Sequence, residues 1–168
     1  MRIYLIGYMG SGKTTLGNKL ARKLGLCFID LDKYLEERNY KTVPQIFSEF
    51  GEEGFRQREK KALEEISEIT DVVVATGGGA PCFFDNMERM NQTGLTVFLD
   101  IPAAELAERL IHSKTDRPLI RGRSKEELIL LIEEMMQKRR PYYSRAKVHI
   151  QHTDNTFESL VEEIRKNR

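Results

Sequence analysis

Short apolar runs alternate along the chain with longer segments in which leucine and isoleucine recur every three or four residues. Leu16, Leu20 and Leu24, for example, follow one another at intervals of four and form one face of a helix. Such alternation is typical of an α/β fold whose ligands bind at the carboxyl ends of parallel strands. The sequence predicts a three-layer α/β/α domain with a central five-stranded parallel sheet. Strands are expected at 3–6, 27–30, 72–75, 95–99 and 147–151, and helices at 33–38, 43–69 (interrupted at 51–54), 103–111 and 125–139, followed by a final helix.

Length and composition fit one globular domain, residues 1–168, with 40% hydrophobic and 32% charged residues. A net charge of +1 argues against a broad surface for nucleic acid or membrane. No apolar run approaches the roughly 20 residues that a membrane span requires. The first strand begins at once, which leaves no room for a targeting peptide. We therefore expect a cytoplasmic protein without nucleic-acid or membrane partners.

Cysteine and histidine show no spacing that predicts a metal site. Cys27 and Cys82 lie in apolar stretches, so we expect buried thiols in a reducing compartment rather than a disulfide. His112, His149 and His152 are expected on the surface or in loops.

A phosphate-binding loop connects the first strand to the first helix. Residues Gly7–Thr14, called the P-loop below, match the pattern G-x-x-x-x-G-K-[ST] at every required position. Glycines allow the backbone N–H groups to wrap closely around an anion, and the helix dipole favours a phosphate there. Lys13 can reach the β- and γ-phosphates, and the Thr14 hydroxyl can bind Mg²⁺. The sequence therefore predicts nucleoside triphosphate binding by Gly10, Ser11, Gly12, Lys13, Thr14 and Thr15.

Two carboxylates, Asp30 and Asp32, leave the second strand together. One can act near Mg²⁺ or its waters, and the other can accept a hydrogen bond or proton from an acceptor substrate. Alternatively, either residue caps the helix that follows. Many P-loop enzymes hold Mg²⁺ with an aspartate at the end of the third strand, where this chain has Ala75 and Thr76. That difference leaves the role to Asp30 or Asp32.

Three consecutive glycines, Gly77, Gly78 and Gly79, follow the third strand and are called the glycine loop below. Their cost in chain entropy indicates that a ligand or another backbone approaches closely.

Arginines gather in three further places. Arg56 and Arg58 follow Phe55, and Arg139 and Arg140 lie in the last turn of a predicted helix. A guanidinium fork suits a carboxylate or phosphate, although a solvated charged face and a favourable helix dipole also explain these positions. The polar run 112–124 contains Arg117, Arg121 and Arg123 and is predicted to be a mobile lid, with an ordinary surface loop as the alternative. Residues 152–156 either contact adenine or cap the final helix.

Taken together, these motifs resemble those of the shikimate kinases, which are P-loop kinases of the nucleoside-monophosphate-kinase-like group. The P-loop alone is shared by many enzymes, whereas the ordered set at these spacings is specific and covers essentially the whole chain. The set comprises Gly7–Thr15, Asp30-Leu31-Asp32, Phe55-Arg56 with Glu59, Gly77–Gly79, Arg117-Pro118-Leu119 and Arg139-x-Pro141-x-Tyr143.

The resemblance implies transfer of the γ-phosphoryl group of ATP, with Mg²⁺, to the 3-hydroxyl of shikimate. Asp32 would contact the shikimate hydroxyls and act as the base, and Arg56 and Arg139 would bind the carboxylate. The glycine loop would lie against the ring, and residues at about 32–60 would form an acceptor-binding helical region. Asp30 would hold Mg²⁺ through water, and Arg117 in the lid would approach the ATP phosphates. In phosphoryl transfer, positioning and charge stabilisation dominate, so Lys13, Mg²⁺ and Arg117 matter most.

Two alternatives remain, one a related kinase and the other a protein of a different class. Another small-molecule P-loop kinase would act on gluconate or a nucleoside monophosphate, but the pairing of Asp32 with Arg56 and Arg139 favours a carboxylated polyol. A nucleotide-dependent switch without transfer is the second alternative. A GTPase would ordinarily carry an N-K-x-D motif, which the sequence lacks. Because no long amphipathic seam is present, we expect a monomer.

Overall fold

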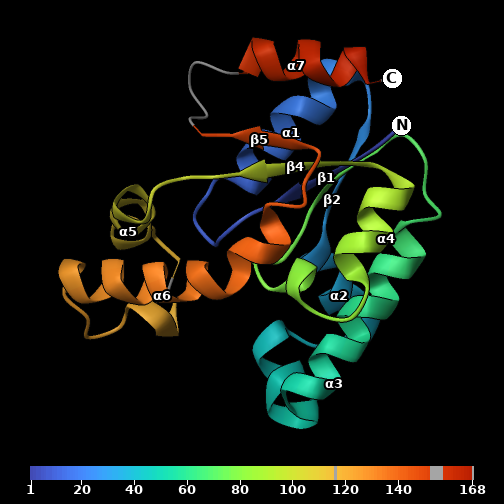
Figure 1. Ribbon diagram of the computed structural model, residues 1–168. Helices are drawn as coiled ribbons and strands as arrows, with labels where there is room; N and C mark the ends of the chain where they lie inside the picture. The colour runs from blue at the N-terminus through green and yellow to red at the C-terminus, as the bar shows by residue number, and fades with distance from the viewer. Residues whose placement is uncertain (116, 152–156, 168) are drawn as a thin grey trace.

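The computed structural model describes residues 1–115, 117–151 and 157–167. Its sheet has five parallel strands in the order β2-β3-β1-β4-β5. Helices cover both faces (Figure 1), which confirms the predicted three-layer α/β/α fold. The strands are β1 Arg2–Ile6, β2 Cys27–Asp30, β3 Val72–Ala75, β4 Leu95–Leu99 and β5 Val148–Ile150.

The helices are α1 Lys13–Leu24, α2 Leu31–Asn39, α3 Val43–Ile66, α4 Asn86–Thr93, α5 Ala103–Ile111, α6 Lys125–Tyr143 and α7 Phe157–Lys166, with short 3-10 turns η1 Ala80–Cys82 and η2 Pro118–Ile120. The four helices with predicted bounds, α2, α3, α5 and α6, begin and end within four residues of them, whereas α4 was not predicted. Two differences matter for function. The α2 helix starts at Leu31, so Asp32 lies in its first turn, and α6 continues through Pro141 to Tyr143.

Alternate side chains of the central strands pack into two separate layers. Tyr4, Ile6 and Val74 face the side covered by α2 to α6, whereas Leu5 and Val73 face α1 and α7. All of these side chains are buried, as expected for parallel strands with helices on both faces. Because β1 lies at the centre of the sheet, the P-loop leaves it between the ends of β3 and β4.

The long helix α3 is kinked at one glycine. Gly51 has φ 69° and ψ −177°, a conformation that L-residues rarely adopt, while the helix continues on both sides. The predicted interruption at 51–54 is therefore confined to one residue. The kink separates the first turns of α3 from the part that carries Arg56.

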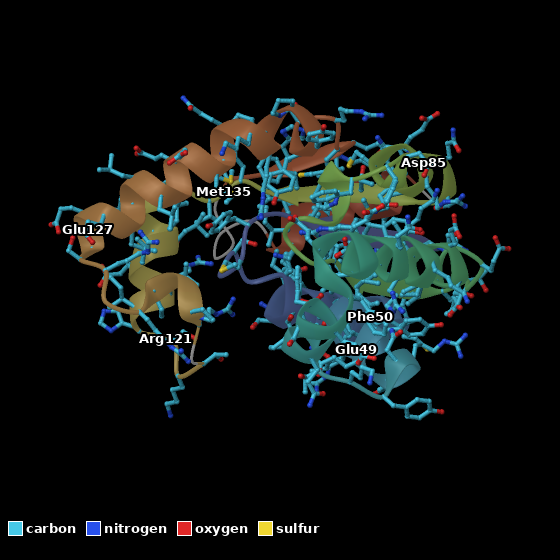
Figure 2. All side chains as sticks on the ribbon, turned by 90° about the horizontal axis from the view of Figure 1, so that it is seen from below. Glu49, Phe50, Asp85, Arg121, Glu127 and Met135 are labelled. Atoms are coloured by element: carbon cyan, nitrogen blue, oxygen red, sulfur yellow. The ribbon has the colours of Figure 1, made fainter. Side chains whose placement is uncertain are left out.

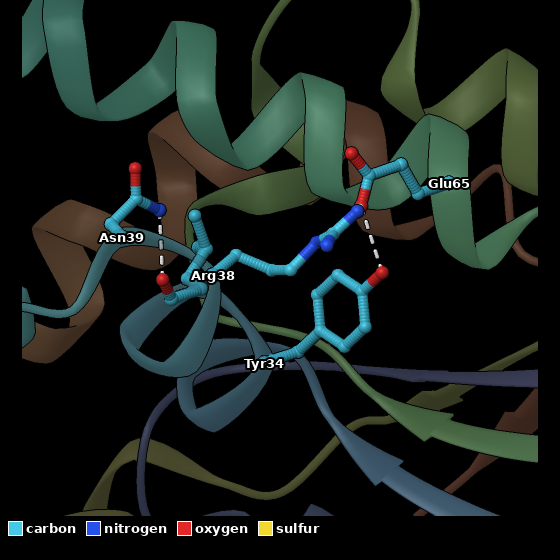
Figure 3. Close-up of polar contacts among 5 residues, drawn as sticks. Tyr34, Arg38, Asn39 and Glu65 are labelled. Carbon is cyan, nitrogen blue, oxygen red and sulfur yellow. Dashed lines mark hydrogen bonds and ion pairs between the residues drawn. The ribbon is translucent and has the colours of Figure 1, made fainter.

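Side chains from α2 and α3 join those two helices (Figure 3). The Tyr34 hydroxyl donates to Glu65 Oε2 at 2.8 Å, and Arg38 Nε and Nη2 donate to the same oxygen at 2.8 and 2.7 Å. Donation from Tyr34, followed by that from Arg38, lowers the pKa of Glu65. This contact, the Glu65 clamp, fixes α2 and the aspartates at its start relative to the second half of α3.

The expectation of two buried thiols is wrong for Cys27, which is exposed at the start of the edge strand β2, while Cys82 is partly buried. Both are free thiols, and burial raises the pKa of Cys82 to about 11. Within the described ranges, no helix combines the length and apolarity needed to cross a bilayer.

Candidate active site

The P-loop wraps tightly between the end of β1 and the start of α1. Gly10 and Gly12 have φ values of 79° and 91°, in the left-handed region that favours glycine. A β-carbon at Gly7 would lie 2.9 Å from the Leu99 carbonyl oxygen, so any larger residue at this position would clash with the backbone of β4. No side chain caps the start of α1, whose first N–H groups can therefore bind an anion.

Lys13 is folded back onto its own loop. Its Nζ donates to the carbonyl oxygens of Gly7 and Tyr8 at 2.8 and 2.9 Å. Burial lowers the pKa of Lys13 to about 8, and the nearby Asp32 carboxylate partly opposes that effect. The ammonium group is thus a buried cation whose hydrogen-bond partners are neutral carbonyls. A bound phosphate would stabilise its charge more strongly than these carbonyls do.

Asp30 uses its two carboxylate oxygens for different contacts. Oδ1 accepts from the backbone N–H groups of Asp32 and Lys33 at 3.1 and 3.2 Å, so Asp30 caps α2. Oδ2 accepts from the Thr14 hydroxyl at 3.1 Å. The capping interpretation is therefore correct for Asp30, and it coexists with a position beside the predicted metal ligand Thr14.

The donors at Thr14 and Asp30 suit Mg²⁺ better than a transition metal. Both supply hard oxygen atoms, and Mg²⁺ in phosphate sites takes few protein ligands beside water and phosphate oxygens. In the part of the chain that the structure describes, no cluster of three or more histidine, cysteine or carboxylate side chains could hold a metal by itself. Thr76, at the end of β3, instead donates its hydroxyl to the Leu5 carbonyl oxygen at 3.1 Å.

Each residue of the glycine loop lies against a charged side chain proposed for the acceptor. A β-carbon at Gly77 would lie 3.2 Å from Asp32 Oδ1, one at Gly78 2.9 Å from Arg139 Nη1, and one at Gly79 2.5 Å from Arg56 Nη2. Side chains, together with the P-loop backbone, therefore approach these glycines closely. The predicted acceptor residues come from α2, α3 and α6 and meet here.

Arg56 is held from two sides, contrary to the interpretation as a solvated charged face. Its Nη1 donates to Glu59 Oε1 at 2.7 Å, and its Cζ lies 4.0 Å from the Phe83 ring centroid. Glu59 is only 1% exposed, and burial raises its pKa while Arg56 opposes that rise.

The cationic side chains of the site retain unused donors. Among the described residues, Arg56 Nε, Arg117 Nε and Arg139 Nη1 are buried without a hydrogen-bond partner. Buried donors without partners are unfavourable, so these atoms fit a site that an anionic ligand completes.

The neighbouring arginines are held elsewhere. Arg58 Nη1 donates to the Gly54 carbonyl at 3.0 Å, and its guanidinium lies 3.5 Å from the Phe50 ring centroid. Arg140 forms a two-point ion pair with Asp100, at 3.1 and 3.2 Å.

A cavity of about 460 Å³ joins the P-loop to Asp32, Gly77 and Gly78, and Arg117, from the segment predicted to be a lid, also lines it. Arg121 and Arg123 are exposed, and Figure 2 shows Arg121 on the segment leading into α6, on the side of the molecule where Glu127 lies. The cavity is lined by Met9, Gly10, Gly12, Lys13, Thr14, Thr15, Asp30, Asp32, Thr76, Gly77, Gly78, Arg109, Leu110, Ser113 and Arg117.

Sequence reasoning missed Arg109. Its Nη1 donates to the Ser11 carbonyl at 3.2 Å and its Nη2 to Glu105 at 2.7 Å. It also lines an adjoining hollow of about 400 Å³ together with Lys19 and Phe157. The spacing of Glu105 and Arg109 by four residues resembles an ordinary surface pair, so the sequence held no signal for a site residue. The predicted adenine contacts at 152–156 lie outside the described residues.

Comparisons with known proteins agree over nearly the whole chain. The family model for shikimate kinase matches residues 9–167. A shikimate kinase from Phocaeicola vulgatus is 60% identical over 146 residues, covering 87% of this chain and 83% of that protein. The crystal structure of shikimate kinase from Bacteroides thetaiotaomicron has a TM-score of 0.91 at 47% identity, covering 99% of this chain and 97% of that one. The shikimate kinase from Acinetobacter baumannii in complex with shikimate has a TM-score of 0.83 at 35% identity, covering 99% and 91%.

Proposed function

The chain belongs to the shikimate kinase family, and from that premise we propose that it transfers the γ-phosphoryl group of ATP to the 3-hydroxyl of shikimate. The products are 3-phosphoshikimate and ADP, in a step of chorismate and aromatic amino acid biosynthesis.

One observation of this chain carries the proposal. Gly77, Gly78 and Gly79 lie against Asp32, Arg139 and Arg56, respectively, and Asp32, Gly77 and Gly78 also line the P-loop cavity. Shikimate is a small polyol with one carboxylate, so it requires cationic donors at one end and hydroxyl acceptors at the other. The buried, unused donors of Arg56 and Arg139 support binding of the carboxylate, and Asp32 supports binding of the hydroxyls.

The residues divide the chemistry between them. The 3-hydroxyl oxygen attacks the γ-phosphorus, the bond from the γ-phosphorus to the β–γ bridging oxygen breaks, and the hydroxyl proton passes to the Asp32 carboxylate. Burial, and then the neighbouring Asp30, raises the pKa of Asp32, which makes it a better proton acceptor. Lys13 and the P-loop N–H groups stabilise the phosphate charges, and Arg117 approaches them as the lid closes.

Mg²⁺ accompanies ATP in this proposal. Thr14 would bind it directly and Asp30 through water, because these oxygen donors lie together beside the P-loop. When bound, the ion supplies positive charge to the β- and γ-phosphates.

The hollow next to the P-loop fits the nucleotide base. Arg109 and Phe157 line it, and Lys19 Nζ lies 4.1 Å from the Phe157 ring centroid. An aromatic ring, a guanidinium and the Leu16 side chain suit a planar heterocycle.

An ADP-release assay with Mg-ATP tests the reaction and the acceptor together. The acceptors are shikimate, gluconate and a set of nucleoside monophosphates, with an acceptor-free control. We expect turnover above the control with shikimate only. Turnover with another acceptor and none with shikimate would leave nucleotide binding intact and contradict the roles of Asp32, Arg56 and Arg139.

We also propose a monomer located in the cytoplasm, as the sequence predicts. Sedimentation velocity at micromolar concentration tests the first point, and a dimer peak at those concentrations would contradict it. Fractionation of the source cells tests the second.

A further inference from the structure

Tyr143 connects the end of α6 to the glycine loop. Its side chain is fully buried, and its hydroxyl donates a hydrogen bond to the carbonyl oxygen of Gly78. Its ring packs against Phe98 of β4, with ring centroids 5.0 Å apart and planes inclined by 39°. Burial raises the pKa of the Tyr143 phenol, which therefore stays protonated as a donor.

The hydrogen bond fixes the middle of the glycine loop. The carbonyl oxygens of Gly77 and Gly79 accept from the backbone N–H groups of Ala80 and Cys82 at 3.2 and 3.0 Å. The Gly78 carbonyl accepts from a side chain, that of Tyr143. Because a trans peptide is planar, its C=O and N–H point in opposite directions, so the tyrosine also sets the direction of the Gly79 N–H.

Gly78 is the point where the P-loop, the glycine loop and α6 meet. A β-carbon there would lie 2.9 Å from Arg139 Nη1 and 3.6 Å from both the Gly7 carbonyl oxygen and the Met9 nitrogen. Arg139 and Tyr143 are four residues apart and therefore lie on the same face of α6. One helix thus presents to the same glycine both a guanidinium and the hydroxyl that fixes its carbonyl.

We propose that Tyr143 is a positioning residue for the acceptor, acting through Gly78 and Arg139. Its hydroxyl holds the Gly78 peptide where the loop and the unused Nη1 of Arg139 together form the carboxylate-binding end of the site. Without the hydroxyl, the partly buried Gly78 carbonyl loses its donor, and we expect the loop to shift towards another. This inference rests on the proposed function, because it concerns the same acceptor site.

Steady-state kinetics of Tyr143→Phe test the inference. We expect the KM for shikimate to rise about tenfold, the effect of losing one hydrogen bond, with kcat and the KM for ATP changed by less than about twofold. Calorimetric titration with shikimate alone should show the same loss of affinity.

Tyr4→Phe is the matched control. Tyr4 is also fully buried, and its hydroxyl lies 2.9 Å from the Thr93 Oγ1, at the amino-terminal edge of the sheet. This variant should lower the Tm without changing the KM for shikimate.

Two unnatural residues at position 143 separate donation from packing. p-Aminophenylalanine retains an N–H donor and should restore the KM for shikimate. p-Fluorophenylalanine places a fluorine close in size to the hydroxyl but without a hydrogen to donate, so it should reproduce the loss even if Tyr143→Phe folds poorly.

Three results would overturn the inference: an unchanged KM for shikimate in both donor-free variants, an equal change of kcat and both KM values, or a failure of p-aminophenylalanine to restore binding. Loss of the proposed function is distinguishable, because the unmodified enzyme would then not turn over shikimate at all.

Discussion

The two halves of the active site are built in different ways. The phosphate half is one continuous segment of strand, loop and helix, and Lys13 is held by carbonyls from six and five residues earlier in the chain. The acceptor half combines α2, α3, the glycine loop and α6, and its parts are joined by packing and by side-chain hydrogen bonds between elements distant in the chain. The phosphate half is therefore fixed by local geometry, whereas the acceptor half depends on how distant elements are held together.

The largest expected effect concerns the phosphate half. Lys13→Ala should lower kcat/KM about 100- to 1,000-fold, because it removes a cation from the transferring phosphate. Lys23→Ala, on the exposed side of the same helix, is the matched control and should leave the rate unchanged. Near-normal kcat/KM in Lys13→Ala would contradict the assignment of the P-loop.

Arg139→Ala should impair the acceptor half of the site and leave the phosphate half intact. We expect the KM for shikimate to rise about 10- to 100-fold and the KM for ATP to change little, because the lost charge-assisted contact is made to the acceptor. The neighbouring Arg140, paired with Asp100, provides the control Arg140→Ala. Equal losses of shikimate and ATP affinity in Arg139→Ala would argue against a role specific to the acceptor.

A remote change at the Glu65 clamp should affect the acceptor half alone. Glu65→Gln weakens contacts to Tyr34 and Arg38 that are partly exposed, so we expect about a two- to fivefold rise in the KM for shikimate. Glu64→Gln is the control, because Glu64 contacts Arg89 of α4 instead. A matching rise in the KM for ATP would show that the two halves are not separable in this way.

The smallest expected effect is the uptake of protons by Lys13 when a nucleotide binds. Because burial lowers the pKa of Lys13 to about 8, the group is half-deprotonated at pH 8 in the free protein. Phosphate favours the charged form, so nucleotide binding at pH 8 should take up about half a proton, and almost none at pH 6. Calorimetry in buffers of different ionisation enthalpy measures the uptake, and an equal uptake by Lys13→Met would assign it to another group.

The same contrast explains what could be predicted. The P-loop is recognisable because its phosphate-binding residues are adjacent in the chain, and the central strands β3, β1 and β4 because they are apolar and buried on both faces. Choosing Arg56 over Arg58 needed the family spacing, since two arginines two residues apart on a helix point to different sides and only packing distinguishes them.

The burial predicted for Cys27 is wrong because its strand is apolar in sequence but lies at the sheet edge. Arg109 was missed because its pairing with Glu105 resembles a surface contact.

The divided carboxylate of Asp30 has a consequence for how this position can evolve. One oxygen caps the start of α2 and the other accepts a hydrogen bond from Thr14, so a replacement must provide both contacts at once. Asparagine keeps one acceptor but turns an amide towards the other partner, and serine has a single oxygen with a shorter reach. Glutamate moves both oxygens away by one methylene. Two separate contacts therefore limit which residues can replace Asp30. A compensating substitution at Thr14 or in the first turn of α2 would remove only one of these two limits.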